Sequence, residues 1–272
     1  MNDQKAVWPV NYSCHFSEFR EGEQFTQIHS LGLVLSGEME LDDGSTKTVF
    51  KEGELYSARK NRLLKFAKYP PKNGEIKTVT LYFDDAVLQD FSREYGYSAE
   101  KKENISTFIK PDSQPLLSFM RSLLPYEELL STSISTELIR LKQKEALILM
   151  LAYDPDLKDV LFDFSEPYKI DIKSFMDKNF HFNAKIERFA YLTGRSLSTF
   201  KRDFQKSFGI PPRQWLQLRR LKEAHILLSQ QDKPVSDIYL ELGFENLSHF
   251  SFAFKKQFGY SPSTVQAQKL KK

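Results

Sequence analysis

Two stretches near the C-terminal end of the sequence place polar, basic and imidazole side chains on the outer side of a predicted helix. These outward side chains are Ser198, Thr199, Lys201 and Arg202 in the first stretch, and Leu247, Ser248, His249, Ser251 and Phe252 in the second. Most of these groups can form hydrogen bonds with the edges of DNA bases. The chemistry that they suggest is recognition of double-stranded DNA.

Four of these residues have distinct expected roles. Arg202 is the main candidate for a base contact, because a guanidinium can bond O6 and N7 of guanine together. Lys201 can contact a base or neutralise a phosphate. His249 can bond to a base or a phosphate, or it is a half-exposed surface histidine. Phe252 can contact a thymine methyl group, or it is buried against a neighbouring helix.

A second set of side chains is basic and is expected to contact phosphates. The set consists of Arg195, Lys206, Arg213, Lys255 and Lys256. Residues 169–272 contain 19 Lys and Arg against 9 Asp and Glu, a net charge of +10, whereas residues 1–168 contain 20 against 27, a net charge of −7. This asymmetry indicates an acidic N-terminal part joined to a part that binds a polyanion.

The helices that must position these residues occur as an internal repeat. Residues 190–212 and 239–262 align from Ser198 onward at a fixed offset of 50 residues. The aligned pairs are Phe200 with Phe250, Phe204 with Phe254, Phe208 with Phe258, Gly209 with Gly259, and Pro212 with Pro262. Gly194 aligns with Gly243 at an offset of 49, so the second copy has one extra residue after its turn. Such duplication indicates a repeated supersecondary unit.

Each copy has the pattern of a helix, a tight turn and a second helix. A glycine permits the turn, a side chain near Ser196 or Asn246 caps the second helix, and two phenylalanines four residues apart bury one face of that helix. This layout predicts two helix-turn-helix units, whose second helices enter the major groove. A long helix over 214–229 is expected to connect them, with the recognition helices one DNA turn, ~34 Å, apart.

Residues 169–272 resemble the DNA-binding domain of the AraC/XylS family of transcription regulators. The resemblance rests on Ala190, Gly194, Ser196, Ser198, Phe200, Phe204 and Gly209, and on Ile238, Gly243, Phe244, Ser248, Phe250, Phe254, Lys255, Lys256, Phe258, Gly259, Ser261 and Pro262. Tyr239 departs from the small residue usual in the family. The resemblance implies a base contact at the position of Arg202, action as an activator, and RNA polymerase as a partner.

The N-terminal part has short alternating apolar segments separated by glycine turns up to residue 83, a pattern typical of a small β-barrel or sandwich. It resembles, more weakly, the family's cupin-like sensory barrel. Helical patterns follow over 84–96 and 116–152, and a dimer contact is expected within 116–152. The expected fold class is α+β: a cupin-like β-barrel with flanking dimerisation helices over 1–165, and an all-α domain with two helix-turn-helix units over 166–272.

Other functions find little support in the sequence. Only His15 and His29 lie in the expected barrel, so a metal site is not expected there, and no cofactor motif or catalytic constellation is found. The competing hypothesis is an enzyme whose helical tail binds protein. A single cysteine, Cys14, and no stretch of ~20 apolar residues indicate a protein of the reducing cytoplasm that does not enter the membrane. The barrel is expected to sense a small molecule or a protein anti-activator.

Overall fold

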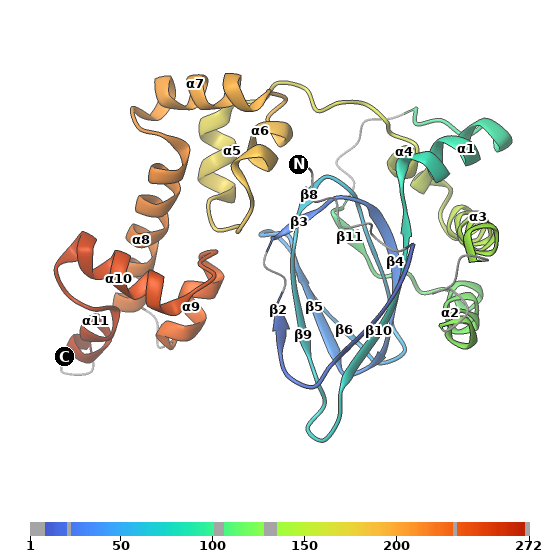
Figure 1. The fold of residues 1–272 in the computed structure, drawn as a ribbon, viewed down its shortest axis with the longest axis horizontal. Coiled ribbons are helices and arrows are strands. Elements are labelled where there is room, and N and C mark those ends of the chain that lie inside the picture. Colours follow the sequence, from blue (N-terminus) through green and yellow to red (C-terminus); the bar gives the residue numbers. More distant parts are fainter. Residues whose placement is uncertain (1–8, 21–22, 101–105, 128–134, 231–232, 270–272) are drawn as a thin grey trace. The chain divides into compact units, whose positions relative to one another are not determined.

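The computed structural model describes residues 9–20, 23–100, 106–127, 135–230 and 233–269 (Figure 1). The chain divides into two compact units. The first contains the described residues up to Ser165 except Glu23–Phe25, and these three residues belong with the second unit, which continues from Glu166 onward. Among the described residues, none of the helices combines the length and apolar character needed to cross a membrane.

The first unit contains three sheets, and the two larger ones are antiparallel. Five strands pair in the order β1 (Val10–His15), β10 (Ile76–Phe83), β4 (His29–Ser36), β7 (Leu55–Ala58) and β11 (Phe108–Ile109). Four pair in the order β2 (Phe19–Arg20), β9 (Lys65–Tyr69), β5 (Glu38–Asp42) and β6 (Lys47–Lys51). The short strands β3 (Phe25–Thr26) and β8 (Arg62–Leu63) form the third.

The expected β-barrel is not closed. The two larger sheets have separate strand orders, and the described residues contain no ladder that joins them into one continuous ring of strands. The mixed α and β composition is confirmed. So is the predicted hairpin at Asp43–Gly44, where β5 and β6 pair from Asp42 opposite Lys47 and Gly44 has a φ of 86°.

Alternation along β4 divides the first unit into two cores, because successive side chains of a strand point to opposite faces. Leu31 and Leu33 pack with the helices that cover the outer face of the five-stranded sheet. Val34 packs in a second cluster with Met39 and Phe50 from β5 and β6. The five-stranded sheet is therefore buried on both faces.

Three main helices cover the outer face of this sheet, where Figure 1 shows them side by side. They are α1 (Asp85–Tyr95), α2 (Gln114–Ser122) and α3 (Ser135–Tyr153), with short turns η1 (Leu124–Tyr126), η3 (Pro155–Leu157) and α4 (Lys158–Leu161). On α3, Ala146 and Leu147 are fully buried, whereas Leu141 is 63% and Ile148 48% exposed.

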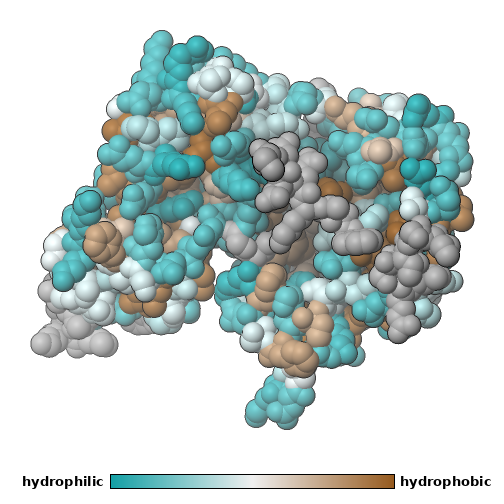
Figure 2. All heavy atoms as spheres, viewed as in Figure 1, coloured by the Kyte–Doolittle hydropathy of each residue, from teal (hydrophilic) through white to brown (hydrophobic). Residues whose placement is uncertain are grey.

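The second unit is helical apart from the segment Glu23–Phe25. Its helices are α5 (Ile172–Asn179), α6 (Ile186–Leu192), α7 (Leu197–Phe208), α8 (Pro212–Gln230), α9 (Val235–Glu241), α10 (Leu247–Phe258) and α11 (Pro262–Lys269). Hydrophilic side chains predominate on the face of the molecule drawn in Figure 2, with hydrophobic ones in scattered patches.

The segment Glu23–Phe25 contacts the residues around the start of α6. The backbone N–H of Gln24 donates to the carbonyl of Asn183 at 2.7 Å, and the N–H of Asn183 donates to Oε1 of Gln24 at 2.8 Å. The guanidinium of Arg188 donates to Glu23 at 3.1 Å and lies 4.7 Å from the ring centroid of Phe25. No pattern in the sequence predicts these contacts.

Candidate nucleic-acid interface

The first helix pair, α6 and α7, is joined by a turn that requires glycine. Gly194 has a φ of 65°, and a Cβ at this position would lie 2.4 Å from the carbonyl carbon of Tyr168. The hydroxyl of Ser196 then caps α7 by accepting the N–H of Thr199 at 3.3 Å. Phe200 and Phe204 are fully buried. These features fix which side of α7 faces outward.

The second helix pair, α9 and α10, repeats this arrangement. Gly243 has a φ of 77°, and a Cβ there would lie 2.7 Å from the carbonyl oxygen of His181. The side chain of Asn246 accepts the N–H groups of Ser248 at 2.8 Å and His249 at 3.0 Å. Phe250 and Phe254 are fully buried. The two outward faces therefore belong to helices of equal length, 12 residues each.

Helix α8 supports both pairs through aromatic contacts. Trp215, near its start, packs against Phe204 at a centroid distance of 5.7 Å. His225, nearly three turns later, stacks on Phe254 at 6.1 Å with an interplanar angle of 9°. The 19 residues of α8 span about 28 Å at a rise of 1.5 Å per residue. Each pair is thus attached to a different part of one helix.

Arg220 of α8 forms hydrogen bonds with two turns of the second unit. Its guanidinium donates to the carbonyls of Phe180 and Phe182 at 2.7 Å each and of Gly243 at 3.0 Å. Burial lowers its pKa to about 10, against the opposing effect of Glu245, so at neutral pH it remains a cation that three carbonyl dipoles solvate. This role of Arg220 is not predictable from the sequence, because residue type does not distinguish an interior basic side chain in a +10 segment from a surface one.

The expected base-contacting residues lie on the outward faces of α7 and α10. Ser198, Lys201, Arg202, Ser248, His249 and Phe252 are exposed, and Thr199 and Ser251 are half-buried. The side chain of Arg202 is 76% exposed, with its Nε 3.6 Å from Asp203. Phe252 is 70% exposed, so the alternative that it is buried against the connecting helix is wrong.

Four of the five residues expected to contact phosphates are exposed: Lys206, Arg213, Lys255 and Lys256. Arg213 of α8 and His249 of α10 line one groove of about 510 Å³ within the second unit, together with Lys185 and Asn183. The groove thus brings together candidates for phosphate and base contacts that are 36 residues apart in the sequence.

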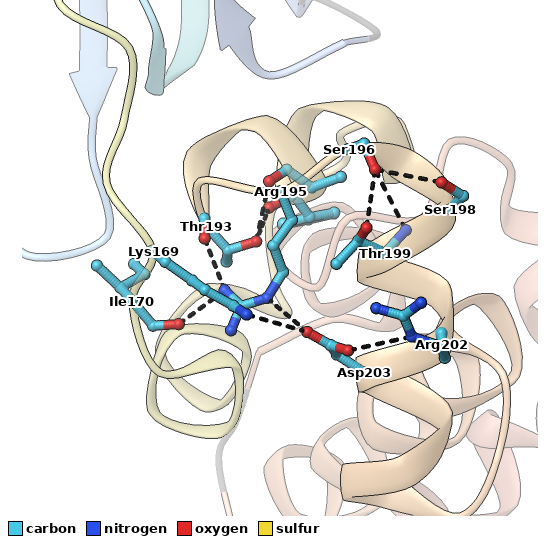
Figure 3. Close-up of polar contacts among 11 residues, drawn as sticks. Lys169, Ile170, Thr193, Arg195, Ser196, Ser198, Thr199, Arg202 and Asp203 are labelled. Atoms are coloured by element: carbon cyan, nitrogen blue, oxygen red, sulfur yellow. Dashed lines mark hydrogen bonds and ion pairs between the residues drawn. The ribbon is translucent and has the colours of Figure 1, made fainter.

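Arg195 differs from the other four because its guanidinium is directed into the unit (Figure 3). The side chain is 9% exposed and donates to the carbonyls of Thr193 at 2.6 Å and Ile170 at 2.8 Å and to the carboxylate of Asp203 at 3.2 Å. Arg195 lowers the pKa of Asp203, with smaller contributions from Lys169 and Arg202. A phosphate contact by Arg195 would compete with three internal hydrogen bonds.

Comparisons with known proteins find two families, one that matches these helices and one that matches the first unit. A family described as a helix-turn-helix domain matches residues 189–268, and one described as the ExsA N-terminal regulatory domain matches residues 29–161. The chain belongs to the AraC/XylS family of transcription regulators. An AraC-family regulator is not an enzyme, so the competing enzyme hypothesis is wrong.

Several individual proteins are similar to all or part of this chain. The HTH-type transcriptional regulator ExsA of Pseudomonas aeruginosa is 28% identical over 92% of this chain and 90% of its own length. The virulence regulon transcriptional activator VirF of Yersinia enterocolitica is 35% identical over 36% of each chain. The apo form of ToxT from Vibrio cholerae, a solved structure, has a TM-score of 0.45 at 12% identity and covers 95% of this chain and 96% of its own.

Membership of this family makes the chain a DNA-binding regulator with a helix-turn-helix domain in its C-terminal part. The matched segment includes α7, α8, α9 and α10, and with them the exposed side chains described above. The family assignment gives the class of partner, double-stranded DNA, whereas the individual contacts depend on the faces of α7 and α10.

Proposed function

We propose that this AraC-family regulator is a sequence-specific activator that inserts α7 and α10 into adjacent segments of the DNA major groove. The observation that supports the proposal most directly is the equivalence of the two helix pairs. In each pair, the second helix begins after a left-handed glycine, buries two phenylalanines, and leaves an exposed polar face. Each pair then forms one helix-turn-helix unit with α7 or α10 as its recognition helix.

The length of α8 supports simultaneous insertion of both recognition helices. About 28 Å of helix separates its ends, and successive major-groove segments on one face of DNA are ~34 Å apart. Helices α7 and α10 contact α8 at two different points along its length, at Trp215 and at His225. The rigid attachment of α8 through Trp215, Arg220 and His225 keeps this spacing constant.

On α7, the proposed base contacts are made by Ser198, Thr199, Lys201 and Arg202. Arg202 has the greatest capacity to discriminate, since it is exposed and can bond guanine at two atoms. On α10, the proposed contacts are made by Ser248, His249, Ser251 and Phe252. The exposed ring of Phe252 is suited to the methyl group of thymine.

Phosphate contacts by Lys206, Arg213, Lys255 and Lys256 provide the part of the affinity that does not depend on sequence. For Arg195 we favour a positioning role, in which its bonds to Asp203 and two carbonyls hold the turn against α7. Any phosphate contact by Arg195 is then secondary to those bonds.

For the first unit, residues 1–165, we propose a regulatory and dimerising role, while residues 166–272 bind DNA. The family description of a regulatory domain over 29–161 supports this division of function. Leu141 and Ile148, exposed and two turns apart on one side of α3, are suited to contact the same helix of a second copy. The regulating signal is a small molecule or a protein anti-activator, and RNA polymerase is the partner in activation.

The DNA proposal is tested by titrating the full chain with its selected operator at several salt concentrations. The observed affinity should fall steeply with salt, because each neutralised phosphate contributes about 0.9 to the slope of log K against log salt. Ala substitutions at Lys206, Arg213, Lys255 or Lys256 should each reduce this slope by ~1. Arg93→Ala, on the surface of the first unit, is the matched control. Unchanged slopes in all four variants would contradict the proposed phosphate contacts.

The signal that regulates the first unit is identified by a separate experiment. A protein anti-activator should co-purify with residues 1–165 from the source cells and lower operator affinity when added back. A small molecule should instead change operator affinity after addition of a protein-free extract.

For the dimer, Leu141→Asp with Ile148→Asp should shift the mass in solution from two chains to one, whereas Phe252→Asp in the second unit should not.

A further inference from the structure

Two residues that line a small cavity of the first unit each have a buried nitrogen atom without a partner. The cavity lies between the ends of β4 and β7, strand β11, and the region from α3 to α4, and its apolar wall includes Met150, Leu157 and Leu161. Among the residues that the structure describes, Nε2 of His29 and Nη1 of Arg59 are buried side-chain atoms without a hydrogen-bond partner. Both residues line this cavity.

The unpartnered nitrogen of His29 is a hydrogen-bond donor. The backbone N–H of Lys60 donates to Nδ1 of His29 at 3.4 Å, so Nδ1 is the acceptor of the ring and the proton lies on Nε2. His29 is only 2% exposed. A buried N–H without an acceptor costs about 1–3 kcal/mol. The N–H of His29 belongs to a residue that lines a cavity able to hold an acceptor.

Arg59 adds a positive charge to the same cavity. Its backbone N–H donates to the carbonyl of Thr107, which anchors the residue beside β11. The guanidinium is 13% exposed, and the carboxylate of Asp163 lies 3.7 Å from Nη2, beyond hydrogen-bond distance. Burial and, to a smaller extent, Arg62 lower the pKa of Arg59 to about 10, against the opposing effect of Asp163. The guanidinium remains charged at neutral pH.

The groups around the cavity select the charge of its occupant. Each of the two residues contributes an unpartnered donor, and that of Arg59 is cationic. Desolvation, and then Lys60, Arg59 and Arg62, lower the pKa of His29, and Lys60 also forms an ion pair with Asp85. Asp163 is the acidic group that acts on Arg59. A neutral water could accept both hydrogen bonds but would bring no negative charge to the guanidinium of Arg59, whose carboxylate neighbour Asp163 lies beyond hydrogen-bond distance.

The size of the cavity limits the occupant further. Its free volume is about 20 Å³, above the ~10–15 Å³ that one water-sized group needs. A sulfate, a phosphate ester or a nucleotide is too large for this space.

We propose that this cavity is a binding site for a small monovalent anion, a halide or the carboxylate of a formate-sized molecule, held between Nε2–H of His29 and the guanidinium of Arg59. The occupied site would join β4 and β7 to the helical layer of the first unit through ionic hydrogen bonds. The site is independent of the DNA-binding surface and of the proposed function.

The test uses thermal unfolding of the full chain, without DNA, at fixed pH and ionic strength. Chloride or formate replaces the bulky anion gluconate stepwise. The expected result is a saturable rise in the Tm of the first unit of roughly 2–4 °C. A response to chloride alone identifies a halide site, and a response to both anions identifies a site that also accepts carboxylates. A Tm that does not respond to either anion overturns the proposal and leaves water as the occupant.

Two variants locate the effect. Arg59→Met and His29→Phe each replace one donor by an apolar group of similar size, and each should abolish the anion response. Arg93→Met, whose guanidinium is 78% exposed, should retain it. Because Arg59→Met removes a buried charge and can alter folding, ³⁵Cl line broadening with the wild-type chain and His29→Phe provides a second measurement. Broadening that formate reverses and His29→Phe removes supports the site, whereas broadening that persists in His29→Phe places the chloride elsewhere and overturns it.

Discussion

Arg195 and Asp203 are joined by an ion pair of 3.2 Å between Nε and Oδ2 that connects the turn before α7 to the middle of that helix. The pair lies one residue away from Arg202, whose guanidinium is exposed. Two arginines of the same recognition element therefore have different surroundings: one is fixed within the unit, and the other is available to a ligand.

The first prediction concerns Arg195→Lys. An ammonium cannot reproduce the fork that reaches two carbonyls and a carboxylate, so we expect the free energy of unfolding of the second unit to fall by about 1–2 kcal/mol. A phosphate contact alone would tolerate lysine. Urea unfolding measures the loss, and the salt slope of DNA binding is the control. Unchanged stability together with a reduced slope would support the phosphate role instead.

The second prediction concerns Arg202→Ala. Because the side chain is 76% exposed, its removal should leave the unfolding midpoint unchanged. Operator binding should weaken by ~1–3 kcal/mol, with relaxed preference at one base pair. Binding to a library of single-base operator variants measures both effects. A uniform loss across all variants would instead identify Arg202 as a phosphate contact.

The third prediction compares two phenylalanines. Phe204→Ala removes a fully buried ring that packs on Trp215, so we expect a loss of ~3–5 kcal/mol in the free energy of unfolding. Phe252→Ala removes a ring that is 70% exposed and should change stability by less than about 0.5 kcal/mol. Urea unfolding distinguishes the two. Operator variants with thymine replaced by uracil then test whether Phe252 contacts a thymine methyl group.

The fourth prediction compares two left-handed glycines. Gly259→Ala adds a methyl group where no atom lies within 4 Å of it, so the cost is that of the backbone conformation alone, about 1–2 kcal/mol. Gly243→Ala adds the same conformational cost and a contact of 2.7 Å with the carbonyl oxygen of His181. Gly243→Ala should therefore destabilise the second unit more. Equal losses of stability would show that the turn can shift to accommodate the methyl group.

The fifth prediction follows from the buried imidazole of His29. Desolvation, and then Lys60, Arg59 and Arg62, hold its pKa well below 6.5 in the folded state. The unfolded chain therefore binds a proton at a pH where the folded chain does not. The stability due to neutral His29 is present above pH 6.5 and is lost as the pH falls below it, by at most about 1.4 kcal/mol per pH unit.

This pH dependence is measured by urea unfolding between pH 7.5 and 5 in the absence of small anions. His29→Phe should remove the corresponding component of the slope, and His225→Phe in the second unit serves as the control. An identical pH dependence in wild type and His29→Phe would show that other groups are responsible.

The helix pairs of the second unit were predictable because their determinants are local. Gly194, Gly243 and the paired phenylalanines specify turns and buried faces within a few residues of themselves. The sequence also indicated the β-rich character of the first unit. It did not indicate that the sheets remain separate, since strand pairing is decided between residues that are far apart in the chain.

The interior roles of basic residues were not predictable. Arg195 and Arg220 have the same side chain as Arg202 and lie in the same basic segment, but both donate to backbone carbonyls of other turns. Those carbonyls belong to residues up to 40 positions away. Residue type and spacing cannot distinguish such a donor from one that faces solvent.

The contacts of Glu23–Phe25 have a practical consequence for dissecting the regulator. A fragment that starts at Glu166 lacks the two hydrogen bonds between Gln24 and Asn183 and leaves Arg188 without its acidic and aromatic neighbours. Arg188 would then present an uncompensated cation on α6 of the DNA-binding part. We therefore expect truncated protein to bind nucleic acid more tightly, and with less selectivity, than the same residues do in the intact chain.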